Sequence, residues 1–193
     1  QELFKRVKDY IDPQQVILSI MAGVKIQSIQ EQLGNLKVVR AMPNLPAQIG
    51  VGMTVFTSSN DVTRIELVTV QNLISATGKA IYVEDENMID AATAVSGSGP
   101  AYVFYFMEGL IKSAQELGFS KAESELLSYQ TFRGAIELFN KFDFSCEEWI
   151  NKVMSKGGTT EAAFKLMNSN STQDKFIQGV HGAYHRAKEL SLH

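Results

Sequence analysis

Hydrophobic and polar residues follow two different periodicities along the first part of the chain. Apolar runs of the length typical of buried strands stand at 16–20, 37–42, 52–56 and 79–83. Apolar residues at helical spacing precede the first run, at 3–10, and separate later ones, at 24–32 and in a helix carrying Ile65 to Leu73 that Asp61 is predicted to cap. This alternation of strand and helix predicts an α/β layer built on a mostly parallel sheet.

From residue 86 onward the strand-like runs stop and helical spacing takes over. Two long helices are predicted, one with apolar residues from Val103 to Leu117 and one with apolar residues from Leu126 to Phe139. Shorter helices are predicted at 146–154, 160–167 and 172–190. The predicted fold is therefore α/β followed by all-α, with domains at 1–85 and 86–193. The broad apolar faces of the long helices suit either a monomer core or the interface with a second subunit.

Composition and charge narrow the classes of function. The 193 residues are 45% hydrophobic and 20% charged, with a formal net charge of -3, which is typical of a globular protein. There is no basic excess to predict a nucleic-acid partner, and no apolar run approaches the roughly 18 to 20 residues of a membrane span. The single cysteine, Cys146, can form no internal disulfide, which favours a reducing compartment and predicts a cytoplasmic location. His181 and His185 are four residues apart without a third ligand nearby, so no metal is expected.

The segment Ser155–Thr160 is a candidate site for a small anion. Gly157 and Gly158 allow a sharp turn and close approach to a ligand, and Thr159 and Thr160 can cap the helix that begins there. The start of a helix leaves backbone N–H groups unpaired, and these attract anions. The alternative is an ordinary capped loop.

Two other glycine-rich segments fail as phosphate-binding loops. The segment 97–102 links two predicted helices and has Tyr102 where a third glycine is required, so it is interpreted as a tight bend between helices. The segment 50–52 leads into a strand and not into a helix, so it fails as a phosphate-binding loop for the same reason.

Arg40 stands near the carboxyl end of a predicted strand, where open parallel sheets bind ligands. The loop that follows contains Pro43 and Pro46, whose rigid backbone suits contact with a flat ring.

Four segments, taken together, resemble pyrroline-5-carboxylate reductases. They are 17–24, 39–46, 90–102 and 153–160, and they follow one another in the order and with the spacing of that family along essentially the whole chain. The combination of Ser-Gly-Ser-Gly-Pro-Ala-Tyr with a later Gly-Gly-Thr-Thr is a specific sign of this resemblance. The chain departs from the family pattern at Leu45, where Thr is common, and at Lys156, where Pro is common. Lys156 is expected to point into solvent.

The resemblance implies a fold and an activity. Residues 1–85 would form the C-terminal half of a Rossmann-like dinucleotide-binding domain whose phosphate-binding part is missing, and 86–193 a helical dimerisation and substrate-binding domain. The implied reaction is reduction of 1-pyrroline-5-carboxylate to L-proline by hydride from NADPH or NADH, in a homodimer of a kind that often associates into a decamer. This chain alone is expected to be inactive. The alternatives are another reductase of the hydroxyacid or imine type with a Rossmann and a helical domain, or a non-catalytic oligomerisation fragment.

The resemblance also implies roles for individual residues. The nicotinamide side of the cofactor site would be lined by Ala41, Met42 and Pro43. The substrate carboxylate would be held by Ser155, Gly158, Thr159 and Thr160. Glu86 would lie near the substrate ring nitrogen, and Glu86 and Thr160 would be the catalytic residues. These roles agree with physical chemistry, because a helix N-terminus suits a carboxylate and a carboxylate side chain suits an iminium nitrogen.

Overall fold

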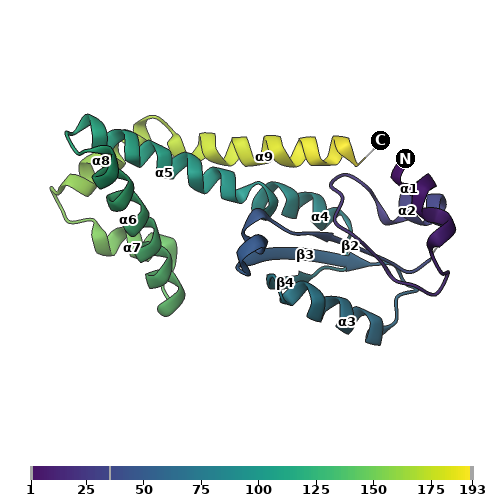
Figure 1. The fold of residues 1–193 in the computed structure, drawn as a ribbon. Coiled ribbons are helices and arrows are strands. Elements are labelled where there is room, and N and C mark those ends of the chain that lie inside the picture. Colours follow the sequence, from purple (N-terminus) through teal and green to yellow (C-terminus); the bar gives the residue numbers. More distant parts are fainter. Residues whose placement is uncertain (1, 35, 192–193) are drawn as a thin grey trace. The chain divides into compact units, whose positions relative to one another are not determined.

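A computed structural model of the chain describes residues 2–34 and 36–191 (Figure 1). The chain forms two compact units. The first runs from the N-terminus to Pro100 and also includes the C-terminal stretch from Gly179, and the second is Ala101–Gln178. The first unit contains the sheet and the second is entirely helical. The predicted order, α/β followed by all-α, is confirmed.

The sheet of the first unit has four strands in the order β1 to β4. They are β1 (Ile17–Ser19), β2 (Val38–Met42), β3 (Gly52–Ser58) and β4 (Gly78–Tyr82). β1 pairs with β2 and β3 pairs with β4 in parallel, which confirms the mostly parallel sheet, but β2 and β3 are antiparallel. The connection from β2 to β3 contains only the 3-10 helix η2 (Leu45–Ile49), and it is too short for the crossover that a parallel pair requires.

Helices cover both faces of this sheet (Figure 1). One face carries α1 (Glu2–Val7), the 3-10 helix η1 (Lys8–Tyr10), α2 (Ile26–Leu33) and α4 (Asn87–Ala92), whereas α3 (Arg64–Ser75) lies on the other. Side chains of β2 alternate between the faces, as expected for a strand. Val39 and Ala41 pack among the buried residues of α3, and Val38 packs against α2. The core of the first unit therefore lies on both sides of β2.

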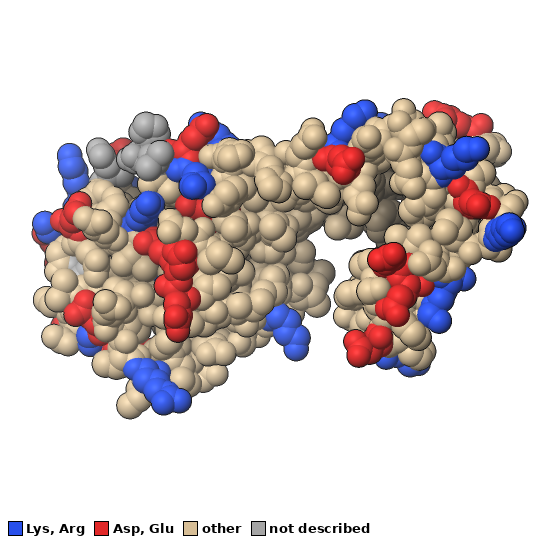
Figure 2. All heavy atoms as spheres, turned by 180° about the vertical axis from the view of Figure 1, so that it is seen from behind, with Lys and Arg blue, Asp and Glu red and all other residues tan. Residues whose placement is uncertain are grey.

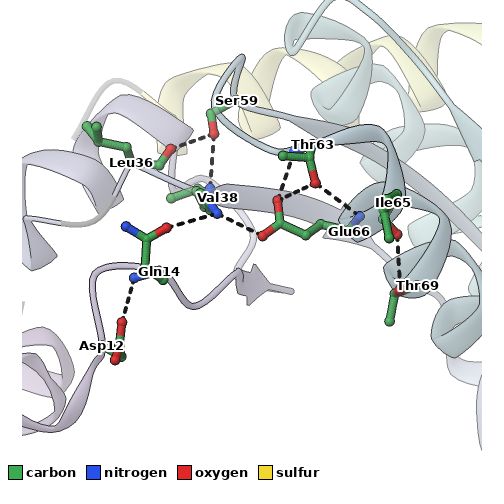
Figure 3. A network of polar contacts seen from close by, with 10 residues as sticks. Asp12, Gln14, Leu36, Val38, Ser59, Thr63, Ile65, Glu66 and Thr69 are labelled. Carbon is green, nitrogen blue, oxygen red and sulfur yellow. Dashed lines mark hydrogen bonds and ion pairs between the residues drawn. The ribbon is translucent and has the colours of Figure 1, made fainter.

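The N-terminal cap of helix α3 lies two residues later than predicted. The cap is Thr63 and not Asp61: the Thr63 hydroxyl accepts from the Glu66 N–H, and the Glu66 carboxylate accepts from the Thr63 N–H. This reciprocal capping box needs Ser or Thr three residues before Glu or Gln, a spacing that Thr63 has and Asp61 lacks. Lys37 joins the same network, because its Nζ lies 2.8 Å from Glu66 Oε1 and 3.3 Å from Gln14 Oε1 (Figure 3).

The passage from α4 to α5 (Gly99–Glu116) consists of a π-helical turn and a bend. Residues Thr93–Gly97 form the π-helical turn, η3, in which the Ser98 N–H donates to the Thr93 carbonyl at 2.9 Å. Ser98 is the bend between η3 and α5, and it keeps right-handed helical dihedral angles. Pro100 lies in the first turn of α5, as predicted.

The helical part continues with α6 (Lys121–Lys141), α7 (Cys146–Val153), α8 (Thr159–Ser169) and α9 (Thr172–Leu190). Within Ala101–Gln178 no hydrophobic side chain reaches the buried class, and only Ser124 and Ser128 do. The large exposed side chains there include Phe104, Tyr105, Leu126, Ile136, Phe139, Val153 and Leu166. Helices with this much accessible apolar surface are typical of a protein interaction site. The second unit, as a single copy, has no hydrophobic core of its own.

The surface of the described residues carries charges of both signs (Figure 2). On the face seen in Figure 2, acidic and basic side chains are interspersed and no large region carries a single sign. Among the described residues, no helix is long and apolar enough to cross a membrane.

The Lys37–Glu66 contact makes a prediction about pH. The hydrogen bond from Lys37, followed by those from Thr63, lowers the pKa of Glu66 from 4.5 to about 2. A carboxylate with a lowered pKa stabilises the fold above its unfolded pKa, and the stabilisation is lost as pH falls through the folded value. We therefore expect Glu66→Gln to lower the melting temperature at pH 7, and the difference from wild type to shrink between about pH 4.5 and pH 2.

Thermal melts followed by circular dichroism across this pH range would measure the difference. Glu31→Gln is a matched control, because Glu31 lies on the exposed side of α2 and, among the described residues, accepts from Gln27. A difference between wild type and Glu66→Gln that stays constant from pH 7 to pH 2 would contradict the assignment.

Candidate active site

A buried arginine lies at the centre of the candidate site. Arg40 belongs to β2 and its side chain is 1% exposed. Its register partners are Ser19 on β1 and Thr57 on β3, both buried. Because an unpaired charge inside a protein is strongly destabilising, this guanidinium needs negatively charged partners.

Two carboxylates from the start of α4 supply that charge. Glu86 Oε1 lies 2.9 Å from Arg40 Nη1, and Asp90 Oδ1 lies 2.9 Å from Arg40 Nη2. The two acidic residues are four apart, one helical turn, so both face the strand. Asp90 is 4% exposed, and its Oδ1 also accepts from Ser191 Oγ at 2.9 Å. The cluster thus connects the sheet, α4 and the end of the described chain.

Glu86 has a second partner at the start of α2. Its Oε1 accepts from the Ile26 N–H at 2.8 Å, and Ile26 is the first residue of that helix. The residue before it, Lys25, provides no side-chain cap, so Glu86 satisfies an N–H that would otherwise lack a partner. Across residues 2–34 and 36–191, no partner is recorded for Oε2 of Glu86, whose side chain is 27% exposed. The carboxylate is therefore fixed at one oxygen and open at the other.

Asn44 orders the loop after β2. Its Nδ2 donates to the Ser96 carbonyl at 3.1 Å, and its Oδ1 accepts from the Met53 N–H at 2.8 Å. Both groups of one amide are thus used, joining the loop to the π-helical turn and to β3. Reasoning from the sequence assigned no role to Asn44, although a polar side chain between Pro43 and Pro46 in a rigid loop was a usable signal.

The predicted cofactor residues differ in accessibility. Ala41 as a whole is 1% exposed, and it packs on the α3 face. Met42 and Pro43 are half-buried, and Met42 packs on the α4 face close to Gly97. Their apolar surface at the end of a strand fits the nicotinamide end of a dinucleotide. The described part of the chain offers no glycine-rich turn from a strand into a helix for the pyrophosphate.

The predicted carboxylate site lies in the second unit, before α8. Gly157 has φ +74, a conformation that favours glycine, and the Gly158 N–H donates to the Ser155 carbonyl at 2.9 Å. A Cβ on Gly158 would meet Ser155 Oγ, so a larger residue there would require the Ser155 hydroxyl to rotate away. The cap of α8 is Gly158, with no side-chain hydrogen bond, and the expected threonine caps are therefore absent.

Thr159 and Thr160 instead occupy the first two positions of α8. Neither hydroxyl has a recorded hydrogen bond to the described residues, and Glu161 accepts from the Gly157 N–H. The backbone N–H groups of a first helical turn have no partner within the helix, which suits an anion. Lys156 is exposed.

A hollow of about 490 Å³ adjoins this turn. It is lined by Met154, Gly157, Gly158, Glu161, Ala162, Phe164, Lys165 and Asn168. Gly158 is the one predicted substrate residue among them. Glu86 and the predicted nicotinamide residues belong to the first unit, whereas Ser155, Gly158, Thr159 and Thr160 belong to the second.

Comparison with known proteins shows similarity to a class of reductases that has a helical dimerisation domain. The sequence model of the family described as "Pyrroline-5-carboxylate reductase dimerisation" matches residues 86–190. This match covers α4 to α9.

Relatives along the rest of the chain identify the family. Pyrroline-5-carboxylate reductase of Synechocystis sp. is 37% identical over 91% of this chain and 65% of its own length. The protein of the same name from Pseudomonas aeruginosa is 36% identical over 94% of this chain and 67% of its own length. The chain therefore belongs to the pyrroline-5-carboxylate reductase family, and it spans about two thirds of the length of these relatives.

Solved structures of proteins with this family name also match the chain. A pyrroline-5-carboxylate reductase from Coxiella burnetii matches with a TM-score of 0.89 and 35% identity, covering 98% of this chain and 71% of that one. Plasmodium falciparum pyrroline carboxylate reductase, solved with NADP bound, matches with a TM-score of 0.92 and 29% identity, covering 98% of this chain and 75% of that one.

The geometry of Asn44 predicts a loss of stability on truncation. Asn44→Ala leaves the Ser96 carbonyl and the Met53 N–H without their partner, so we expect the free energy of unfolding to fall by about 1 to 3 kcal/mol. Unfolding in urea would measure the free energy of unfolding of the wild type and of the variant. Gln48→Ala, in the same loop at an exposed position, is the control and should change stability by less than about 0.5 kcal/mol. Equal losses for the two variants would contradict the role given to Asn44.

Proposed function

We propose that the protein reduces 1-pyrroline-5-carboxylate to L-proline with NADPH or NADH. The observation that carries the proposal is that relatives named pyrroline-5-carboxylate reductase align with more than nine tenths of this chain at 36–37% identity. A carboxylate with an open oxygen and a helix start with free N–H groups support it, because the substrate has a basic ring nitrogen and a carboxylate. When bound, the reduced nicotinamide supplies the hydride.

The residues of the chain would contribute charge and position. Glu86 would stabilise the positive charge on the protonated imine nitrogen. Ala41, Met42 and Pro43 would line the nicotinamide side of the cofactor site, with Met42 and Pro43 against the ring. The substrate carboxylate would be bound by Ser155, Gly158, Thr159 and Thr160. In this scheme Glu86 and Thr160 are the catalytic residues. No covalent intermediate is needed, because orientation and charge complementarity carry the reaction.

Assembly and location complete the proposal. We infer a homodimer formed through the helical region, in which the accessible apolar side chains of the second unit become buried, and an association of dimers into a decamer. We place the protein in the cytoplasm. The dimer is supported by the match to a dimerisation domain and by the lack of buried hydrophobic side chains in Ala101–Gln178.

The activity is tested with the intact protein. We expect oxidation of NADPH or NADH, followed by absorbance, when 1-pyrroline-5-carboxylate is added, and formation of L-proline in equal amount. A 2-hydroxy acid with the oxidised cofactor is the control substrate and should give no reaction. Turnover of the 2-hydroxy acid without reduction of the imine would contradict the proposal.

Thr160→Val tests the carboxylate site. The substitution removes a hydroxyl but keeps the shape of the side chain, and we expect kcat/KM for 1-pyrroline-5-carboxylate to fall by roughly ten-fold or more through the loss of a hydrogen bond to a charged group. Thr172→Val, also at a helix start in the second unit, is the matched control. If Thr160→Val left both kcat and KM unchanged, the role of Thr160 would be wrong.

A further inference from the structure

We propose that Arg40 is a positioning residue for the Glu86 carboxylate and that Asp90 holds Arg40 in turn. The inference rests on the function proposed above, in which Glu86 faces the substrate ring nitrogen. Arg40 is 1% exposed and would touch neither substrate nor cofactor, so it acts through Glu86.

The hydrogen bonds of Glu86 distinguish its two oxygens. Oε1 accepts from Arg40 Nη1 at 2.9 Å and from the Ile26 N–H at 2.8 Å. Within the part of the chain that the structure describes, Oε2 has no recorded partner, and 27% of the side chain is accessible. A carboxylate held by two donors at one oxygen presents the other oxygen in a fixed direction.

The charges of this cluster do not cancel. One guanidinium opposes two carboxylates, which leaves a formal charge of about -1 by simple counting of opposite charges. The Asp90 side chain is 4% exposed, and its Oδ1 accepts from both Arg40 and Ser191, so the Asp90 carboxylate is buried and has partners. The surplus negative charge therefore lies at Glu86, the accessible end, where a cationic ring nitrogen would be attracted.

Stability alone does not explain a guanidinium at this position. The neighbours of Arg40 on the same face of β2, Val38 and Met42, pack in apolar clusters. A buried ion pair adds little net stability compared with well-packed apolar side chains. Arg40 Nε, moreover, has no hydrogen-bond partner among the described residues. Unlike an apolar residue, Arg40 can hold a carboxylate.

Substitutions in the intact protein test the proposal. Arg40→Lys keeps the charge but loses the fork that reaches both carboxylates, and Asp90→Asn removes the second anchor with little change in size. We expect each to lower kcat/KM for the imine by roughly ten-fold or more, at a melting temperature that shows a folded protein. Lys37→Gln is the matched control, because it breaks an ion pair of 2.8 Å from a residue just before β2 and should change kcat/KM by less than about two-fold.

A double-mutant cycle separates positioning from a general structural role. In a Glu86→Gln background, Arg40→Lys should lower kcat/KM by less than about two-fold more, because the group through which it acts has been removed. If the effects of the two substitutions multiplied in full, Arg40 would act independently of Glu86 and the proposal would be overturned.

Hydrogen exchange gives a readout that needs no turnover. Because the Ile26 N–H donates to Glu86 Oε1, its exchange rate reports whether the carboxylate is held. Arg40→Lys should speed exchange at Ile26 by about five-fold or more, whereas Lys37→Gln should leave it unchanged. Unchanged exchange in Arg40→Lys would overturn the positioning role. Failure of the unsubstituted protein to reduce the imine would instead overturn the proposed function.

Discussion

The first unit depends on the neutralisation of one buried charge. Arg40 lies in the middle of the sheet with almost no contact with water, so its guanidinium requires carboxylates within hydrogen-bond distance. Glu86 and Asp90 meet this requirement only if α4 packs on that face of β2. Glu86 in turn caps α2, and Asp90 binds Ser191 near the end of the described chain. A single electrostatic requirement therefore brings together segments that are far apart in the sequence.

The second unit is governed by a different constraint. The first unit buries apolar residues on both faces of its sheet, whereas Ala101–Gln178 buries none in a single copy. Its helices are nevertheless well specified, since Ser120 with Glu123 and Ser145 with Glu148 form complete capping boxes. Local signals thus define where these helices start, while their apolar faces stay accessible in a single copy. This agrees with the dimerisation family that matches 86–190.

Local pattern was sufficient to predict the elements but not the contacts between them. Strand-like runs located the four strands of the described residues, both the buried β2 and the largely exposed β4. Direction depends on the connection, so the antiparallel pairing of β2 with β3 was missed although the short link was visible. The cap of α3 was placed at Asp61 because the spacing of Thr63 to Glu66 was overlooked. The Arg40 cluster was beyond reach, since its partners stand 46 and 50 residues away.

The glycine turn before α8 shows how a correct local prediction can have a wrong internal assignment. The sequence indicated a sharp glycine turn at a helix start, and the structure has it, but Gly158 takes the capping position that was given to the threonines. Because the Gly157 N–H is satisfied by Glu161, the turn is stable without help from either threonine hydroxyl. A hydroxyl that is not needed for capping remains available to another acceptor. The failure of the capping prediction therefore strengthens the proposal that Thr159 and Thr160 bind the substrate carboxylate.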